Sequence, residues 1–200
     1  MTRLSPRRTK KLASVFAGGA ILAACGGGSP LDNPETLKNP PGLTGQKLSF
    51  VYFQRCVNPV LVTPVITNGQ PSVNTCAAGG CHDNVTGTGG ALRLLGGAPA
   101  VDPTQGAAVI RASDIYKNYY SSLGETVVGA PDQSRLLNKP LVRSVLHGGG
   151  LIFENPTDAG AKLFRYWINR PMPQGQDEFS PAANTMFANG DPVNGACNTD

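Results

Sequence analysis

The segment TCAAGGCHDN, residues 75–84, constrains the fold of this chain more than any other stretch. Four small residues separate Cys76 from Cys81, and His82 follows the second cysteine directly. The chain has one further histidine, His147. Because the three side chains of the segment are close along the chain, the fold must place two thiols and an imidazole within one small region.

Two closely spaced thiols and an adjacent imidazole can hold a haem. The thiols add to the two vinyl groups of the porphyrin and the imidazole binds the iron, a pattern that normally reads C-x-x-C-H. Here four residues lie between the cysteines, but the adjacency of Cys81 and His82 is kept. The intervening Ala-Ala-Gly-Gly can loop outward, because glycine adopts unusual backbone dihedrals. The motif therefore predicts one haem c, with thioether bonds to Cys76 and Cys81 and with His82 as the proximal iron ligand.

Two other interpretations of the motif remain open. Cys76 and Cys81 can close a small disulfide loop, which would leave His82 at the surface. A metal ion such as zinc is less favoured, since two cysteines and one histidine lack the usual fourth ligand. We expect haem in preference to both.

The N-terminus has the pattern of an export signal. Residues 1–24 begin with basic residues and continue with an apolar run that is too short for a stable membrane anchor. The run ends in Leu-Ala-Ala-Cys, which resembles the lipobox of bacterial lipoproteins. In that family the signal is cut before the cysteine, here Cys25, whose thiol carries lipid. Gly26 after it favours sorting to the outer membrane, so we expect an outer-membrane lipoprotein that faces the periplasm or the cell surface.

Removal of the signal changes the charge of the protein. The signal holds five of the 17 basic residues and none of the 13 acidic ones, so the mature chain is close to neutral. The basic pI of the whole chain therefore belongs mostly to the signal. No basic patch remains to indicate nucleic-acid binding.

The remaining chain divides into three parts by composition. Residues 25–45 are rich in glycine, proline and polar residues without periodicity, which predicts a flexible tether. Residues 46–170 hold the periodic apolar segments and form the expected domain. Residues 171–200 have the composition of a loop-rich tail, in which we expect Asp177 and Glu178 to be solvated.

Three segments of the expected domain have helical features. The first starts near residue 46 and ends at Pro59, and residues 103–124 predict one helix or two short ones. The last helix has Asn155 as its N-cap and Pro171 as its stop. The apolar face of this last helix consists of Gly160, Leu163, Phe164, Trp167 and Ile168.

Several phrases, in this order, resemble a c-type cytochrome domain of exported bacterial proteins. They are YFQRCVNPVL, NTCAAGGCHDN, ALRLL, SRLLNKPL followed by HGGGLIF, and FRYWINR, and they span about residues 46–170. The resemblance implies an all-α, cytochrome c-like fold with long loops, in which the first and last helices pack around a covalently bound haem. The expected helix crossing joins Leu48, Val51 and Tyr52 to Gly160, Phe164 and Trp167.

The distal iron ligand is expected on the loop before the last helix. Many members of the resembled family carry Met-Pro there, whereas this chain carries His147 and three glycines, which let the backbone approach a porphyrin face closely. His147 is therefore the first candidate. Met172 is a less favoured alternative because it follows the last helix, and Met186 is a poor candidate. A second histidine ligand lowers the reduction potential relative to methionine and leaves no open position on the iron, which favours electron transfer over catalysis.

Cys56 and Cys197 remain once lipid and haem are assigned. An exported protein meets an oxidising compartment, in which thiols normally form disulfides. We therefore expect a Cys56–Cys197 disulfide that pins the tail to the first helix.

Together these features favour a periplasmic carrier of single electrons rather than an enzyme, with redox proteins as partners and membrane contact through the lipid anchor. Two alternatives stay open. One is a haem-free structural or interaction lipoprotein stabilised by two disulfides, and the other is a haem enzyme or sensor with an open distal site. No paired carboxylates, nucleophile elbow or phosphate loop stands out in the sequence to indicate hydrolysis.

Overall fold

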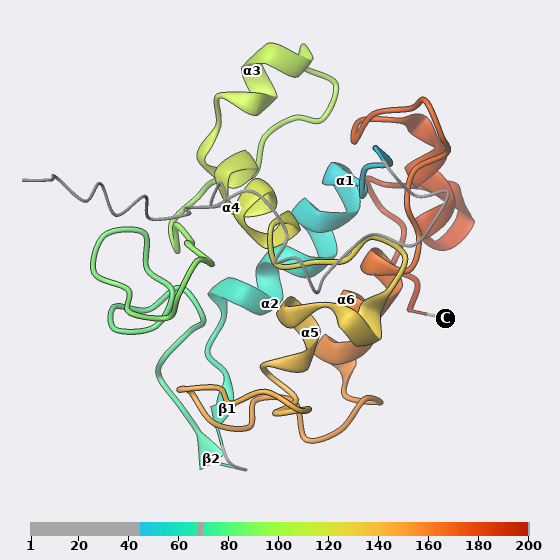
Figure 1. Ribbon diagram of the computed structural model, residues 1–200. Helices are drawn as coiled ribbons and strands as arrows, with labels where there is room; N and C mark the ends of the chain where they lie inside the picture. The colour runs from blue at the N-terminus through green and yellow to red at the C-terminus, as the bar shows by residue number, and fades with distance from the viewer. Residues whose placement is uncertain (1–44, 68–69, 200) are drawn as a thin grey trace, which may run out of the picture.

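The computed structural model describes residues 45–67 and 70–199 (Figure 1). The expected signal at residues 1–24, Cys25 and the tether up to residue 44 lie outside the described residues. Within the described residues, no helix is long and apolar enough to cross a membrane.

Regular structure in the described part of the chain is mainly helical, and it includes one small antiparallel hairpin. In order, the elements are α1 (Phe50–Tyr52), the π-helical turn η1 (Phe53–Val57), α2 (Asn58–Val62), β1 (Ile66–Thr67), β2 (Gln70–Pro71), α3 (Ala107–Arg111), α4 (Asp114–Leu123), the 3-10 turn η2 (Pro131–Gln133), α5 (Arg135–Asn138), α6 (Ala159–Ile168) and the 3-10 turns η3 (Pro181–Met186) and η4 (Ala188–Gly190). The prediction of a helical protein with long loops is confirmed at this level. The sequence pattern does not predict the hairpin, because strands of two residues show no detectable alternation.

The first helical segment runs without a break through α1, η1 and α2. Ser49 caps it, since its side chain accepts a hydrogen bond from the backbone N–H of Tyr52 at 3.1 Å. The prediction that Pro59 ends this helix is wrong. Pro59 lies in the first turn of α2, directly after the π-helical turn in which Asn58 N–H bonds to the Phe53 carbonyl. The changed register of that turn tolerates a residue without an N–H, and the helix continues to Val62.

The first and last helical segments cross in the core (Figure 1). The indole of Trp167 lies against Phe53, with ring centroids 5.3 Å apart, and donates a hydrogen bond to the Ser49 carbonyl at 2.9 Å. Leu48 lies before α1 and is fully buried, and its carbonyl accepts a hydrogen bond from Tyr119 of α4. The crossing therefore brings three helices of the chain together around one aromatic cluster.

The last helix begins later than the sequence predicts. Asp158 is the N-cap, and its carboxylate accepts a hydrogen bond from the Gly160 N–H at 2.8 Å. Asn155, the expected cap, instead accepts a hydrogen bond from the Thr157 N–H in the preceding turn. Asn and Asp are both good N-cap residues, so residue type alone does not decide between them. Phe153 packs directly against Gly160 in the first turn of the helix.

The expected pair of short helices between residues 103 and 124 is present as α3 and α4. Asn118 of α4 is completely buried and connects this region to the first helix. Its amide donates hydrogen bonds to the Asn58 side chain and to the Leu95 carbonyl, and its oxygen accepts one from the Leu95 N–H at 2.7 Å. The segment that follows the C-x₄-C-H motif is thereby held against two helices.

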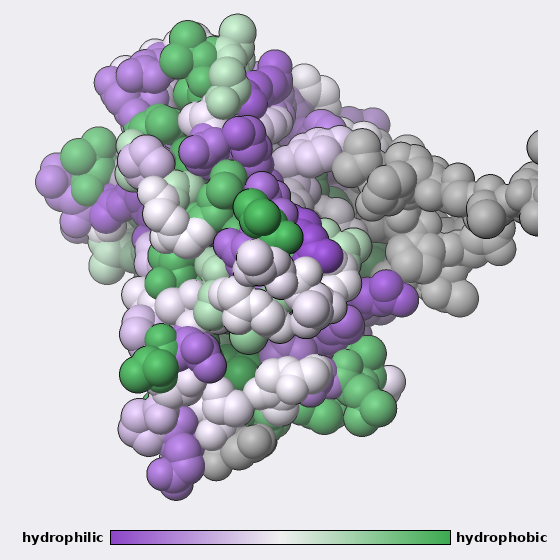
Figure 2. Space-filling model, turned by 90° about the vertical axis from the view of Figure 1, so that its left-hand side faces the viewer, coloured by the Kyte–Doolittle hydropathy of each residue, from purple (hydrophilic) through white to green (hydrophobic). Residues whose placement is uncertain are grey.

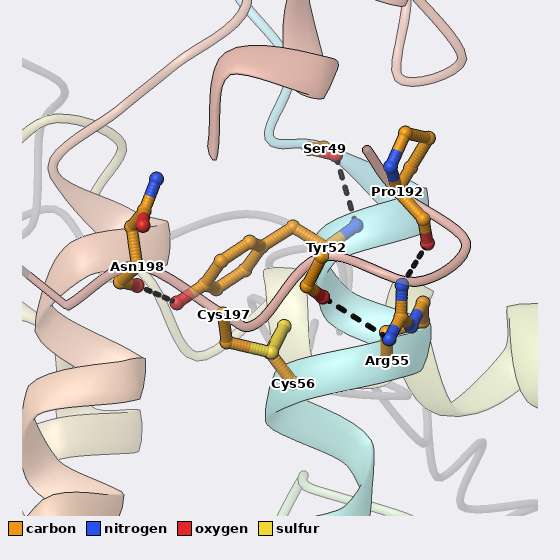
Figure 3. Close-up of a disulfide and its surroundings, with 8 residues drawn as sticks. Ser49, Tyr52, Arg55, Cys56, Pro192, Cys197 and Asn198 are labelled. Atoms are coloured by element: carbon orange, nitrogen blue, oxygen red, sulfur yellow. Dashed lines mark hydrogen bonds between the residues drawn. A yellow bond between two sulfur atoms is a disulfide. The ribbon is translucent and has the colours of Figure 1, made fainter. Parts of the chain in front are cut away.

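The C-terminal segment is joined to the first helix by a Cys56–Cys197 disulfide, which agrees with the expected pairing (Figure 3). The Tyr52 hydroxyl donates a hydrogen bond to the Asn198 carbonyl at 2.5 Å, and Arg55 donates to the Pro192 carbonyl. Figure 3 shows these side chains on successive turns of the helix, all directed toward the same loop.

The interpretation of Glu178 as a solvated residue of a loose tail is wrong. Its side chain is 3% exposed and accepts hydrogen bonds from the Tyr116 hydroxyl at 2.8 Å and from Arg111 at 3.0 Å. Its backbone carbonyl accepts from the N–H of Phe50 at the start of α1. Asp177 is exposed as expected. The C-terminal segment is therefore part of the core, because its carboxylate and apolar side chains complete the packing around α1 and α4.

Candidate functional site

The two cysteines of the C-x₄-C-H motif lie on a compact turn that follows the hairpin. Ala77 N–H bonds to the Leu61 carbonyl, which ties the start of the turn to α2. His82 N–H bonds back to the Cys76 carbonyl at 3.0 Å, so the residues between them form a closed loop. Gly80 has a φ of +80°, in the left-handed region that favours glycine. The four residues between the cysteines thus form one closed turn, in which Ala77 is buried and Gly79 and Gly80 are exposed.

Cys76 and Cys81 are both free thiols in this structure, and both are half-buried. Burial, with a smaller contribution from Cys81, raises the pKa of Cys76 to about 11. The Cys76 thiol is therefore protonated at neutral pH. Both cysteines line the same cavity.

His82 is held in one orientation by the segment that follows the motif. Its Nδ1 lies 3.2 Å from the Leu92 carbonyl oxygen, which leaves Nε2 as the available nitrogen. Burial lowers the pKa of His82, so the neutral imidazole is favoured. A neutral ring whose second nitrogen is bonded to a carbonyl is the usual state of a metal-binding histidine.

His147 approaches the same region from the loop between α5 and α6. Its Nδ1 lies 2.7 Å from the Gly150 carbonyl oxygen, so its Nε2 is also the available nitrogen. The rings of His82 and His147 have centroids 6.4 Å apart and planes inclined by only 12°. Two metal–imidazole bonds of about 2 Å each, with the half-width of a ring at either end, span roughly 6 Å. The centroid distance of the two rings is therefore close to the spacing of two imidazoles that share one iron atom.

The cavity between these groups has a volume of about 760 Å³, within the range of small-molecule and cofactor sites. Its walls combine the two thiols and two imidazoles with apolar side chains, which include Leu61, Leu92, Leu136, Phe153 and Phe164. Exposed Val85 and Leu146 lie in the loops that carry the histidines. In the space-filling view, which faces the left-hand side of Figure 1, patches of hydrophobic residues interrupt a mostly polar surface (Figure 2).

Gly89 is part of the site and is not singled out by the sequence pattern. A Cβ atom at this position would lie 2.6 Å from the His82 ring and 2.7 Å from the Cys81 carbonyl oxygen. Gly87 meets a similar limit against the backbone of Asp83. The glycine-rich run after the motif, TGTGG at residues 86–90, is the signal that indicates this close approach.

The methionine alternatives do not meet His82 in the structure. Met172 is buried in the core, where its N–H bonds to the Lys47 carbonyl at 2.7 Å. Met186 is buried at the end of η3. The residues that line the cavity include His147 and neither methionine.

The residues present fit a haem better than a metal ion held by protein side chains alone. Among the described residues, no group of three or more His, Cys, Asp or Glu is placed to hold a metal ion. A haem iron needs only two axial ligands from the protein, because the porphyrin supplies the other four. The two histidines provide that number, and the two free thiols match the two vinyl groups.

Comparisons of the chain with protein-family models, with curated proteins and with solved structures found no match.

Proposed function

We propose that this chain is a periplasmic electron-transfer protein that carries one covalently attached haem c, as in the c-type cytochromes that its motifs resemble. Cys76 and Cys81 form the thioether bonds, and His82 and His147 are the axial ligands. The observation that carries the proposal is the parallel pair of imidazoles, 6.4 Å apart, beside two free thiols on one cavity. When bound, the haem supplies reversible one-electron chemistry.

The protein's own residues supply the attachment and the ligands. Each thiol would add across one vinyl group, with its sulfur on one carbon and its hydrogen on the other, so the attachment would need no oxidant or reductant. The carbonyls of Leu92 and Gly150 keep both imidazoles oriented through Nδ1. Two histidine ligands would leave small molecules no open position on the iron, which would favour electron transfer over catalysis.

The N-terminal sequence indicates where in the cell the protein would transfer electrons. The signal at residues 1–24 and Cys25 support an exported protein held at the outer membrane by lipid, facing the periplasm or the cell surface. Its partners are then redox proteins that exchange single electrons within reach of that membrane.

Haem staining of a denaturing gel tests the proposal. The full chain is exported together with a cytochrome maturation system, and a stain that survives denaturation shows a covalent link. C76S combined with C81S should lose the stain, whereas C197S should keep it, because that cysteine belongs to the disulfide. Colourless secreted protein with Cys76 joined to Cys81 would refute the proposal.

A further inference from the structure

Two cations line the candidate haem cavity. Arg135 begins α5 and Lys139 is its C-cap, so their side chains lie one helical turn apart on the cavity side. Glu125 lines the cavity beside them, and the Leu136 N–H bonds to its carbonyl at 2.9 Å. Neither cationic side chain forms a hydrogen bond or a salt bridge to another residue in the described ranges.

Several cations elsewhere in the described chain have closer acid partners. Arg143 and Arg165 both bind Asp132 at 3.0 Å, and Arg111 binds Glu178 at 2.9 Å. Arg135 and Lys139 differ from these cations. Their side chains line the cavity, and no acid of the described residues lies at ion-pair distance from them.

Glu125 does not balance the two cations by itself. Burial raises the pKa of Glu125, and this effect outweighs the opposing influence of Arg135 and Lys139. One carboxyl group that resists ionisation therefore faces two positive charges. Arg135 is exposed and Lys139 is half-buried, so both charges stay available at the cavity wall to the acid groups of an occupant.

A haem has this chemistry, since an apolar ring carries two propionate carboxylates. We propose that Arg135 and Lys139 bind those two carboxylates and so orient the acidic edge of the cofactor toward α5. This inference rests on the proposed function. Positive charge close to the iron disfavours its oxidised form, so both residues should also raise the reduction potential.

R135Q and K139Q test the inference, with R143Q as the matched control. Arg143 is a cation of the same region that pairs with Asp132 and does not line the cavity. All three variants should keep the haem stain, because attachment depends on the two cysteines. The reduction potential should fall in R135Q and K139Q, and the propionate bending band in the resonance Raman spectrum should shift. Neither should change in R143Q, and K139R should restore the wild-type band.

Stained R135Q and K139Q proteins whose potential and propionate band match those of R143Q would overturn the inference alone. A wild-type protein without covalent haem would overturn the proposed function, and this inference with it.

Discussion

The imidazole rings of His82 and His147 lie nearly parallel, with centroids 6.4 Å apart, although they come from loops on opposite sides of α3, α4 and α5 in the sequence. Each ring is fixed through Nδ1 by a backbone carbonyl of its own loop. In the proposed function, two rings that are each oriented by their own loop would serve as a preorganised pair of iron ligands.

Replacement of His147 by methionine should raise the reduction potential and alter the low-spin absorption spectrum, because the identity of the axial ligand is a main determinant of both. Spectroelectrochemical titration measures the two effects together. M172L is the control: Met172 is buried outside the cavity, so its volume-conserving replacement should leave the spectrum as it is. An unaltered spectrum in H147M would eliminate His147 as a ligand.

Carbon monoxide should not bind readily to the reduced wild-type protein, because both axial positions are occupied. Substitution H147G removes the distal ligand and should permit binding, seen as a shift of the main absorption band on exposure to the gas. Ready binding by the wild type would instead favour the sensor or enzyme alternative with an open distal site.

Substitution G89A should displace the His82 ring, since a Cβ atom at residue 89 would lie 2.6 Å from it. We expect loss of the low-spin signal in electron paramagnetic resonance or reduced haem attachment. G97A is a suitable control, because a Cβ atom there would meet nothing within 4 Å. A G89A protein with wild-type spectra would show that the loop can move away without disturbing the ligand.

Removal of the Cys56–Cys197 disulfide should lower the free energy of unfolding by up to about 5 kcal/mol, the chain-entropy estimate for a loop of this size. Denaturant titration of C56S, C197S and the double variant measures it. The three should be similarly destabilised, since each loses the same bond. A much smaller loss in all three would mean that the contacts of Tyr52 and Arg55 hold the C-terminal segment without the disulfide.

Glu178 should make the stability of the protein depend on acidic pH. Burial by itself raises the pKa of this carboxyl, but hydrogen bonds from its own backbone N–H, Tyr116 and Arg111 outweigh it and leave the pKa below its usual value. The lowered folded-state pKa contributes stability above the unfolded value of about 4.3, and this contribution is lost as pH falls through the folded-state pKa.

Substitution E178Q removes this contribution and should cost about 2 kcal/mol at neutral pH, typical of hydrogen bonds to a charged group. Unfolding titrations between neutral and acidic pH measure the difference from wild type, which should shrink as the pH falls below about 4. E154Q, at an exposed position, should follow the wild-type curve. A difference between E178Q and wild type that does not change with pH would argue against an ionised Glu178.

Residues that are close in sequence were sufficient to predict several features. The adjacency of Cys81 and His82 and the short loop from Cys76 are fixed by covalent connectivity, and the structure keeps them in one turn. The apolar face of α6 is likewise a local pattern, because helical geometry alone puts those residues on one side. The pairing of Cys56 with Cys197 followed once the other cysteines had been assigned.

Contacts between distant residues required the tertiary structure. The π-helical turn that lets the first helix pass Pro59, and the burial of Glu178 against Arg111 and Tyr116, depend on packing that no local pattern encodes. The approach of Gly89 to the His82 ring is of the same kind. The sequence by itself determined which side chains are candidates for holding a porphyrin, because that choice depends on residue type and spacing. Only the tertiary structure decided that His147 and not Met172 faces His82, because the packing of the loops between the helices sets which distant side chains meet.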